Sequence, residues 1–326
     1  MRNEESLYII SIIDNVGVWY LEFSAFIKIE ELAREPEAVL ATIAYLSDKL
    51  SFLKKGEDVL ICFRDHRENS IGWLMEQAVL RCGAVPVLWG EDHRWKNLLR
   101  LAFSTRATTV IGLPLIVLGL CKLARHNGTP LYIRNVVTAG YPCLDWMIDG
   151  IRSGLDCESW GCFGPGTGAV VAGFSCGRSL GVHLRSDVYG VDIADESGRP
   201  VPPGQLGEMI LYPKLAPEVR CELGENARLD PSLCDCGSEE VRLLDLQPGR
   251  STNLELEQLG ERIHSWTSVL DCSIRKSDYG LELELVIFPG EKLPELPNCA
   301  KQVIRPWCPD TDEPLWYQPR TADMGL

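Results

Sequence analysis

The fold of this chain is decided by the stretch DVLICFRDHRENSIGWLMEQAVLRCGAVPVL, residues 58–88. Residues 59–63 form a short apolar run that predicts a buried strand. Residues 70–81 have the apolar spacing of a helix, which Gly83 ends, and residues 84–88 predict the next strand. A strand, a helix and a second strand in this order predict a crossover unit with parallel strands.

The same alternation extends to both sides of this unit. Further strands are predicted at residues 7–13, 109–111 and 135–138, and further helices at Glu30–Leu53, 95–104 and 115–126. Strands and helices that take turns at this interval predict a largely parallel sheet flanked by helices.

The pattern changes after Gly161, where helices give way to short strands and turns. Strands are predicted at 183–184, 189–193, 207–212 and 281–288, the last with one wet face because its apolar and acidic residues alternate. We therefore expect an α/β protein with a large N-terminal domain, residues 1–248, of mixed and parallel sheets flanked by helices. This domain includes a β-rich subdomain at about 175–248, and a small α+β C-terminal domain spans 249–326.

Composition narrows the class of protein. The chain has 326 residues and a formal net charge of −14, which repels nucleic-acid backbones and anionic membrane surfaces. Its apolar runs at 7–13 and 110–120 are too short for a secretory signal or a membrane span. We expect a cytoplasmic protein that binds neither nucleic acid nor membrane, whose thirteen cysteines are reduced and buried, or bound to metal.

Several short segments resemble a known family in their order and spacing. They are Thr138–Pro142, Trp160–Thr167, Pro203–Glu208, Pro217–Glu225, Gly249–Ser251 and Pro319–Thr321. Over roughly residues 57–325 they resemble the phenylacetate–CoA ligase branch of the adenylate-forming, AMP-binding ligases. Enzymes of this family join a carboxylic acid to AMP from ATP and then usually transfer the acyl group to a thiol.

The resemblance implies a binding site for nucleotide and substrate, with ATP or AMP and Mg²⁺ as cofactors. Its residues would be Ala139, Gly140, Tyr141, Phe163, Gly164, Gly166, Thr167, Gly168, Arg220, Glu225 and Arg250. The implied partners are a small carboxylic acid and, as acceptor, CoA or a carrier protein. The glycines at 164–168 are alternatively a plain turn between a strand and a helix.

Several family positions are replaced, and no catalytic residue is assigned. The Ser/Thr/Gly-rich phosphate loop that ends in lysine is missing, since residues 9–23 hold one glycine and no lysine. Thr167 stands where the family has a metal-binding glutamate, and Glu225 stands where it has the aspartate that binds ribose. The closing lysine is absent as well. These departures weigh against the usual mechanism of adenylation.

A metal site is indicated by Cys234-Asp235-Cys236-Gly237, because two thiolates on a tight turn can hold a tetrahedral ion. The pairing of this turn with Cys176 and His183 resembles a pattern of phenylacetate–CoA ligase relatives. Three sulfurs and one imidazole would close a structural zinc site. The alternative is a set of reduced core cysteines beside a surface histidine.

Two functions follow. One is a shortened, ATP-dependent adenylate-forming ligase with fewer of the family's functional residues. It would activate or bind an aryl carboxylic acid as an acyl adenylate in a biosynthetic pathway. The other is a non-catalytic pseudoenzyme of the same fold that binds a ligand or a partner. A third option is that a partner chain supplies the missing N-terminal parts. The acid, the acceptor and the formation of a homodimer are left open.

Overall fold

We describe a computed structural model of the chain. The residues described are 11–14, 17–20, 23–90, 93–140, 145–164, 170–176, 181–248, 254–277, 280–293, 295–296 and 301–315.

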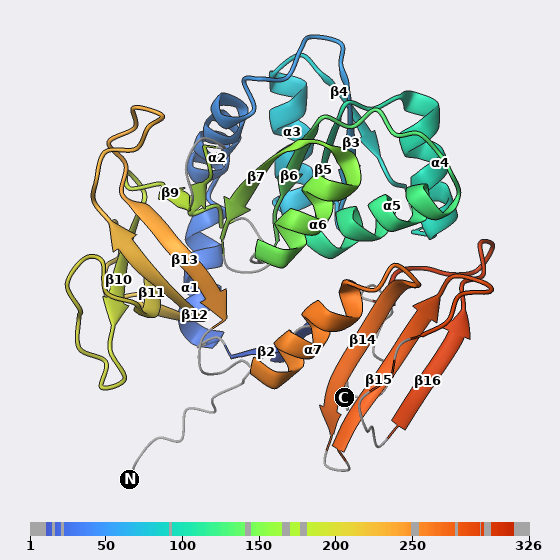
Figure 1. The fold of residues 1–326 in the computed structure, drawn as a ribbon. Coiled ribbons are helices and arrows are strands. Elements are labelled where there is room, and N and C mark those ends of the chain that lie inside the picture. The colour runs from blue at the N-terminus through green and yellow to red at the C-terminus, as the bar shows by residue number, and fades with distance from the viewer. Residues whose placement is uncertain are drawn as a thin grey trace.

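Five parallel strands form the centre of the molecule (Figure 1). They are β3 (Asp58–Cys62), β4 (Val85–Leu88), β5 (Thr109–Gly112), β6 (Asn135–Thr138) and β7 (Glu158–Phe163), in the order β7-β6-β5-β3-β4. The helices between them are α3 (Ile71–Arg81), α4 (Trp95–Thr105), α5 (Pro114–His126) and α6 (Asp145–Leu155). The bounds of β3 to β6 and of α3 to α5 match the predicted strands and helices within a residue or two, whereas α6 and β7 are not predicted. The predicted α/β class is confirmed.

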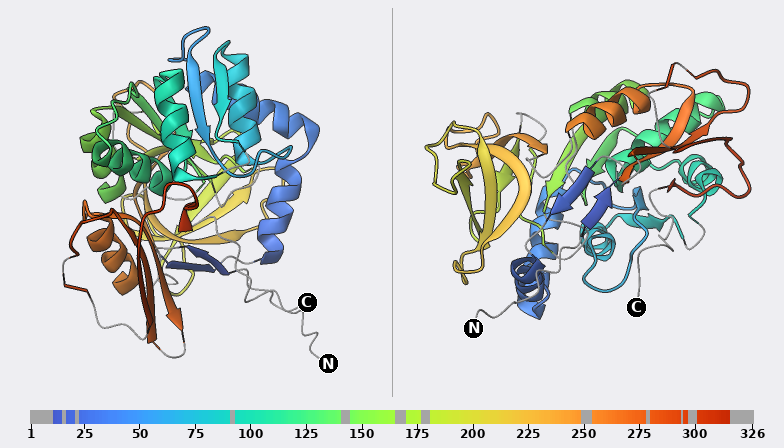
Figure 2. Two further views of the ribbon diagram at one scale, coloured as in Figure 1. Left: turned by 90° about the vertical axis from the view of Figure 1, so that its right-hand side faces the viewer. Right: turned by 90° about the horizontal axis from the view of Figure 1, so that it is seen from below.

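The local sequence explains where helix α3 of the crossover unit begins. The Ser70 hydroxyl accepts a hydrogen bond from the backbone N–H of Trp73 at 3.3 Å, which caps the first turn of α3. Helix α2 packs with α3, whereas α5 packs with both α4 and α6, so the helices form two groups that flank the sheet (Figure 2). The parallel strands are thereby covered on both faces.

An antiparallel part continues the same sheet beyond β7. Its strands are β8 (Gly173–Phe174), β9 (Val182–Leu184), β10 (Tyr189–Ala194), β11 (Gly207–Pro213), β12 (Cys221–Asp230) and β13 (Arg242–Pro248). They follow in the order β7-β8-β9-β13-β12-β11-β10, so β10 is one edge strand of the whole sheet and β4 is the other. The predicted mixture of parallel and antiparallel strands is confirmed.

The N-terminal segment differs from its prediction. Instead of one helix over Glu30–Leu53, the chain forms α1 (Phe23–Ala33) and α2 (Pro36–Lys49). Pro36 begins the second helix because its ring has no N–H to donate to the preceding turn. A short hairpin of β1 (Ser11–Asp14) and β2 (Gly17–Tyr20) precedes α1.

The C-terminal part is a separate sheet covered by one helix. It consists of α7 (Leu254–His264), β14 (Val269–Ser277), β15 (Gly280–Ile287) and β16 (Lys301–Pro306), with sheet order β14-β15-β16. On β15 the side chains of Leu283 and Leu285 are buried, and those of Glu282 and Glu284 are partly exposed, as the alternating pattern predicts. The domain boundary predicted near Gly249 lies outside the described residues and stays a prediction.

Helix α5 joins the two parts, since ten of its thirteen residues are buried. On the C-terminal side His126 stacks on Phe288, with ring centroids 4.1 Å apart and planes 10° apart. Phe288 and Trp307 belong to the same apolar core as the parallel strands. On the neighbouring helix α4, the Lys96 ammonium donates a hydrogen bond to the Asp310 carboxylate at 2.7 Å. None of the described helices combines the length and apolar character needed to cross a membrane.

A close contact between α4 and α5 gives a test of this packing. A Cβ on Gly119 would lie 2.2 Å from the outer ring of Trp95, which is itself 1% exposed. We expect Gly119→Ala to lower the free energy of unfolding by about 1–3 kcal/mol, although alanine is the better helix former. In a Trp95→Phe background the loss should be smaller, because the clashing ring atoms are gone. Equal losses in both backgrounds, measured by urea unfolding, would contradict this account.

Candidate functional site

The predicted loop residues follow two neighbouring strands at their carboxyl ends. Ala139 and Gly140 come directly after β6, whereas Phe163 ends β7 and Gly164 follows it. Because β6 and β7 pair in parallel register, these segments lie side by side at the carboxyl ends of the two strands, which we call the carboxyl edge of β6 and β7. Open α/β sheets bind ligands at this edge.

Two glycines at this edge fit where no larger residue would. Gly140 has a φ of +100°, and a Cβ there would lie 2.6 Å from Cδ2 of Leu113. A Cβ on Gly164 would lie 2.1 Å from the carbonyl oxygen of Val170. The backbone at Gly140 thus lies against the Leu113 side chain, and the backbone at Gly164 lies against that of Val170. The remaining predicted residues of this region lie outside the described ones: Tyr141, Gly166, Thr167, Gly168 and Arg250.

Arg220 directly precedes β12 and already has a partner. Its guanidinium forms an ion pair with the carboxylate of Asp192 on β10 and lies 5.1 Å from the ring centre of Tyr212. Arg220 and Glu225 are five residues apart at β12, which separates them by about 16 Å in an extended strand. The structure does not bring these two predicted residues together.

Glu225 is a buried carboxyl group, 5% exposed, on the strand beside Pro248. Its Oε2 atom has no hydrogen-bond partner among the described residues. Burial raises the pKa of Glu225 to about 8, so the carboxyl is largely protonated at neutral pH. In that form it can donate a hydrogen bond as well as accept one.

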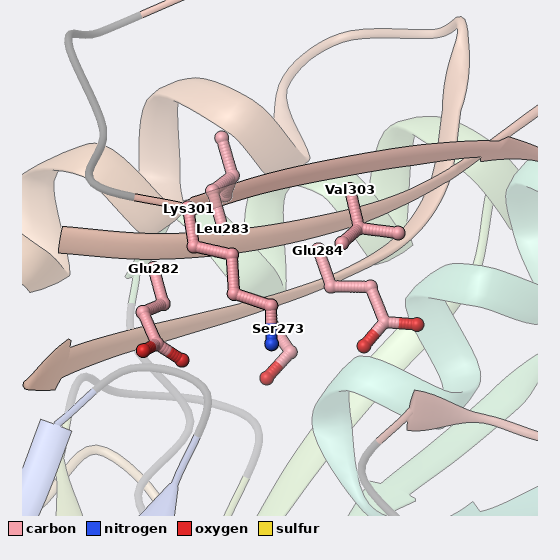
Figure 3. A pocket seen from close by; sticks show the side chains of 6 residues that line it. All are labelled: Ser273, Glu282, Leu283, Glu284, Lys301 and Val303. Carbon is pink, nitrogen blue, oxygen red and sulfur yellow. The ribbon is translucent and has the colours of Figure 1, made fainter.

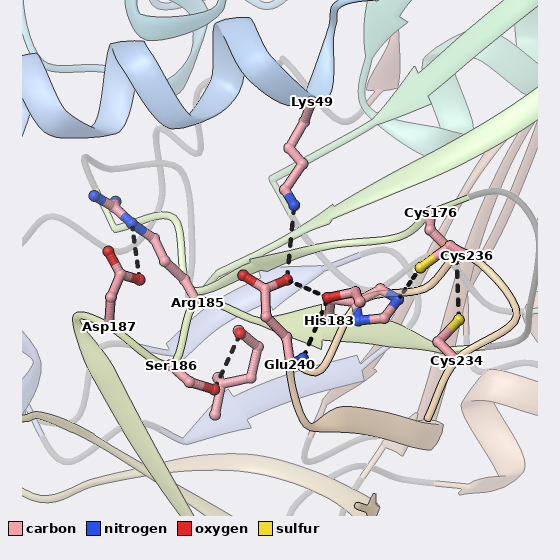
Figure 4. A network of polar contacts seen from close by, with 11 residues as sticks. Lys49, Cys176, His183, Arg185, Ser186, Asp187, Cys234, Cys236 and Glu240 are labelled. Carbon is pink, nitrogen blue, oxygen red and sulfur yellow. Dashed lines mark hydrogen bonds and ion pairs between the residues drawn. The ribbon is translucent and has the colours of Figure 1, made fainter. Parts of the chain in front are cut away.

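The four predicted metal ligands are brought together by strand pairing. Cys176 follows β8, and His183 lies on β9, which pairs with β8 on one side and with β13 on the other. Cys234 and Cys236 lie in the loop between β12 and β13. The ligand atoms of all four residues lie within 4.8 Å of one another (Figure 4).

The distances within this cluster fit a tetrahedral ion. The Sγ atoms of Cys176 and Cys234 are 3.7 Å apart, and Sγ of Cys236 lies 3.4 Å from Nε2 of His183. Around zinc, bonds of about 2.3 Å to sulfur and 2.0 Å to nitrogen separate ligands by about 3.8 Å and 3.6 Å. Three thiols and one imidazole would complete four coordination positions, which is the donor set of a structural site.

The loop that carries two of the sulfurs is held in shape from both ends. The backbone N–H of Gly237, at φ +84°, donates to the carbonyl of Cys234 at 2.8 Å, which closes the predicted tight turn. Arg242 forms an ion pair with Asp230 across the base of the loop, and its Nη1 lies 3.9 Å from Sγ of Cys234. No sequence pattern singles out Arg242, because its contact depends on the pairing of β12 with β13.

Comparison with family models gives no match, and comparison with curated protein sequences gives none either. Solved structures do match. A 2-hydroxyisobutyryl-CoA ligase in the postadenylation state has a TM-score of 0.63 at 14% identity, covering 86% of this chain and 68% of that chain. The same ligase in complex with 2-HIB-AMP and CoA has a TM-score of 0.57 at 16% identity, covering 76% and 57%.

A benzoate CoA ligase from Burkholderia xenovorans LB400 has a TM-score of 0.51 at 12% identity, covering 81% of this chain and 62% of that chain. This chain thus spans 57–68% of the lengths of these three structures. At these identities the likeness concerns the fold alone. The chain has the fold of the adenylate-forming CoA ligases.

Proposed function

We propose that the chain binds a small aryl carboxylic acid and ATP at the carboxyl edge of β6 and β7 and joins them as an acyl adenylate. The observation that carries this proposal is the pair of closely packed glycines, Gly140 and Gly164, which follow neighbouring strands at that edge. A glycine would let a ligand approach the backbone and reach its N–H donors without side-chain interference. The related fold of CoA ligases solved with acyl-AMP adducts supports the same assignment.

The remaining parts of the proposal follow the family pattern. Thr167 and Arg250 would complete the nucleotide site, Mg²⁺ would accompany ATP, and CoA or a carrier protein would accept the acyl group in a biosynthetic pathway. The phenylacetate–CoA ligase branch is favoured by the Cys/His cluster. We place the chain in the cytoplasm, a reducing compartment in which cysteine thiols persist.

A non-catalytic role is the second candidate. It is favoured by Arg220, whose charge is engaged by Asp192, and by Glu225, whose carboxyl is largely protonated at neutral pH. The Arg220 guanidinium is then not free for a phosphate, and Glu225 does not offer the ionised carboxylate that the family uses to bind ribose. In this case the chain would bind an acid, an acyl adenylate or a partner protein without turnover.

The cluster of Cys176, His183, Cys234 and Cys236 is proposed to hold one structural zinc ion. We expect about one equivalent of zinc in the purified protein, measured by elemental analysis. Cys234→Ser should lose the metal and lower the melting temperature, because structural zinc stabilises only the folded chain. Cys308 is exposed, and Cys308→Ser is the matched control, which should keep both the bound zinc and the wild-type melting temperature. A well-folded protein without zinc would refute the assignment.

Adenylation is tested by ATP–pyrophosphate exchange with a panel of aryl and alkyl acids. We expect exchange with at least one aryl acid, and its loss in Gly164→Ala, whose Cβ would collide with the backbone of Val170. Gly161→Ala on the same strand is the control, since its Cβ would meet only Thr138 at 3.9 Å. Calorimetry with ATP and AMP separates the two candidates. Exchange with any acid refutes the non-catalytic role, whereas the absence of both exchange and nucleotide binding refutes adenylation.

The buried carboxyl of Glu225 predicts a pH dependence of stability. Its pKa is raised from 4.5 to about 8, so between these values the folded chain holds a proton that the unfolded chain has lost. Stability contributed by this proton is therefore complete below pH 4.5 and is lost as pH rises toward 8. Glu225→Gln should gain stability relative to the wild type over this window, on the order of a few kcal/mol at pH 8.

Urea unfolding of both proteins at pH 5, 6.5 and 8 measures this difference. The exposed Glu218→Gln controls for the loss of one charge. A difference between wild type and Glu225→Gln that stays constant with pH would show that the carboxyl of Glu225 is ionised throughout.

A further inference from the structure

A cavity of about 420 Å³ lies between the two parts of the chain, among α5, α6 and α7. The residues that shape its floor and walls are Leu118, Cys121 and Lys122 of α5, Trp146 and Gly154 of α6, and His264 of α7. None of them belongs to the candidate site at β6 and β7 or to the Cys/His cluster. Cavities of 300–1,000 Å³ are typical of small-molecule sites.

A second hollow, on the face of β14, β15 and β16 that bears Glu282 and Glu284, differs in size. It measures about 60 Å³, and the Lys301 side chain extends between the carboxylates of Glu282 and Glu284 (Figure 3). This volume holds no more than a few waters. The interdomain cavity is therefore the better candidate for an organic ligand.

Lys122 has little to compensate its charge. Its ammonium donates one hydrogen bond, to the carbonyl oxygen of Val269 at 2.9 Å, and forms no ion pair with the residues that we describe. Asp271 is near but engaged, because its two oxygens accept from the backbone N–H groups of Cys272 at 2.9 Å and Leu315 at 2.7 Å. Burial of the ammonium lowers the pKa of Lys122 to about 8.

Of the four other buried titratable groups described around this ammonium, three are neutral at neutral pH and Asp271 is about half ionised. Burial raises the pKa of the thiols of Cys121 and Cys272 and lowers that of the His264 imidazole, which keeps all three neutral. Burial also raises the pKa of Asp271 to about 7. A part-buried ammonium with one neutral acceptor and a half-ionised carboxyl nearby costs free energy, and an anion in hydrogen-bond contact would offset that cost.

The walls favour an apolar body and one negative charge. The Trp146 ring stacks on His264, with centroids 5.6 Å apart, and Leu118 and Cys121 add apolar surface. The exposed rim is mixed in sign, with Arg125 and His126 on α5 and Glu261 and Glu291 on the C-terminal part. The two rim carboxylates disfavour a polyanion such as a nucleotide.

We propose that this interdomain cavity binds a small apolar monocarboxylate, whose carboxylate accepts hydrogen bonds from Lys122 and whose apolar body packs against Trp146 and Leu118. Such a ligand touches α5 and α6 on one side and α7 on the other. Its binding therefore stabilises the contact between the two parts of the chain. The proposal does not rest on adenylation, since it needs neither ATP nor the edge of β6 and β7.

The test is calorimetry without ATP, using benzoate, phenylacetate and octanoate beside the neutral amides benzamide and phenylacetamide. We expect the carboxylates to bind at least tenfold more tightly than their amides. At pH 8.5, in buffers of different ionisation enthalpy, binding should take up most of a proton, because the bound anion raises the pKa of Lys122. Affinity should fall as pH rises above 8.

Variants assign the effect to one side chain. Lys122→Met should abolish both proton uptake and the preference for carboxylates, whereas Lys122→Arg should keep the preference. Lys96→Met, at the same interface but paired with Asp310, is the matched control and should bind like the wild type. Thermal unfolding of each variant checks that it is folded.

Each other outcome overturns the proposal. Absence of binding for the whole panel, equal binding of acids and amides, or wild-type binding by Lys122→Met would refute it. Carboxylate binding that survives in Lys122→Met and is lost in Gly164→Ala would place the acid at the edge of β6 and β7 instead. Failure of ATP–pyrophosphate exchange, in contrast, leaves this site unaffected and bears only on adenylation.

Discussion

The burial of α5 from two sides is the constraint on which the rest of the structure depends. One side of this helix packs on the parallel sheet, and its last turn meets Phe288 and Trp307 of the C-terminal part. Because both contacts are apolar and share one core, the C-terminal strands are held against the sheet by the same hydrophobic effect that forms it. The candidate ligand edge and the interdomain cavity both take their shape from this arrangement.

The join between β7 and β8 has a comparable role for the sites. At this point the sheet changes from parallel to antiparallel strands, so the chain after β7 must fold back. That return brings the backbone of Gly164 against that of Val170 on one side of the join and leads to the Cys/His cluster on the other. A single change of strand direction thus positions two of the features that carry the proposals.

Much of the fold can be predicted from the sequence, and the reasons for success or failure differ between regions. The unit at 58–88 is predicted because its apolar runs, the helical spacing at 70–81 and Gly83 all agree. The break at Pro36 is missed because the surrounding residues favour helix, although proline alone marks the start of α2. Strand β12 reads as polar, since pairing with β11 and β13 determines its structure rather than its own propensity.

The site residues likewise divide into those that a local sequence pattern identifies and those that only the fold brings together. The Cys234-Asp235-Cys236-Gly237 turn is local and is found from sequence, whereas the ion pair of Arg220 with Asp192 and the burial of Glu225 depend on strand register. Lys122 lies in a helix predicted correctly, yet its burial comes from Val269 and other residues far along the chain. Such long-range contacts have no signature in a single sequence.

The edge strand β4 has a further consequence for the behaviour of the chain in concentrated solution. The backbone N–H groups of Val85 and Trp89 point toward the neighbouring strand, since they donate to the carbonyls of Glu57 and Ile61. By alternation, the nitrogen of Pro86 faces outward, where it has no hydrogen to offer. An approaching strand would find little of the donor row that edge-to-edge pairing requires, so this end of an eleven-stranded sheet is protected against aggregation.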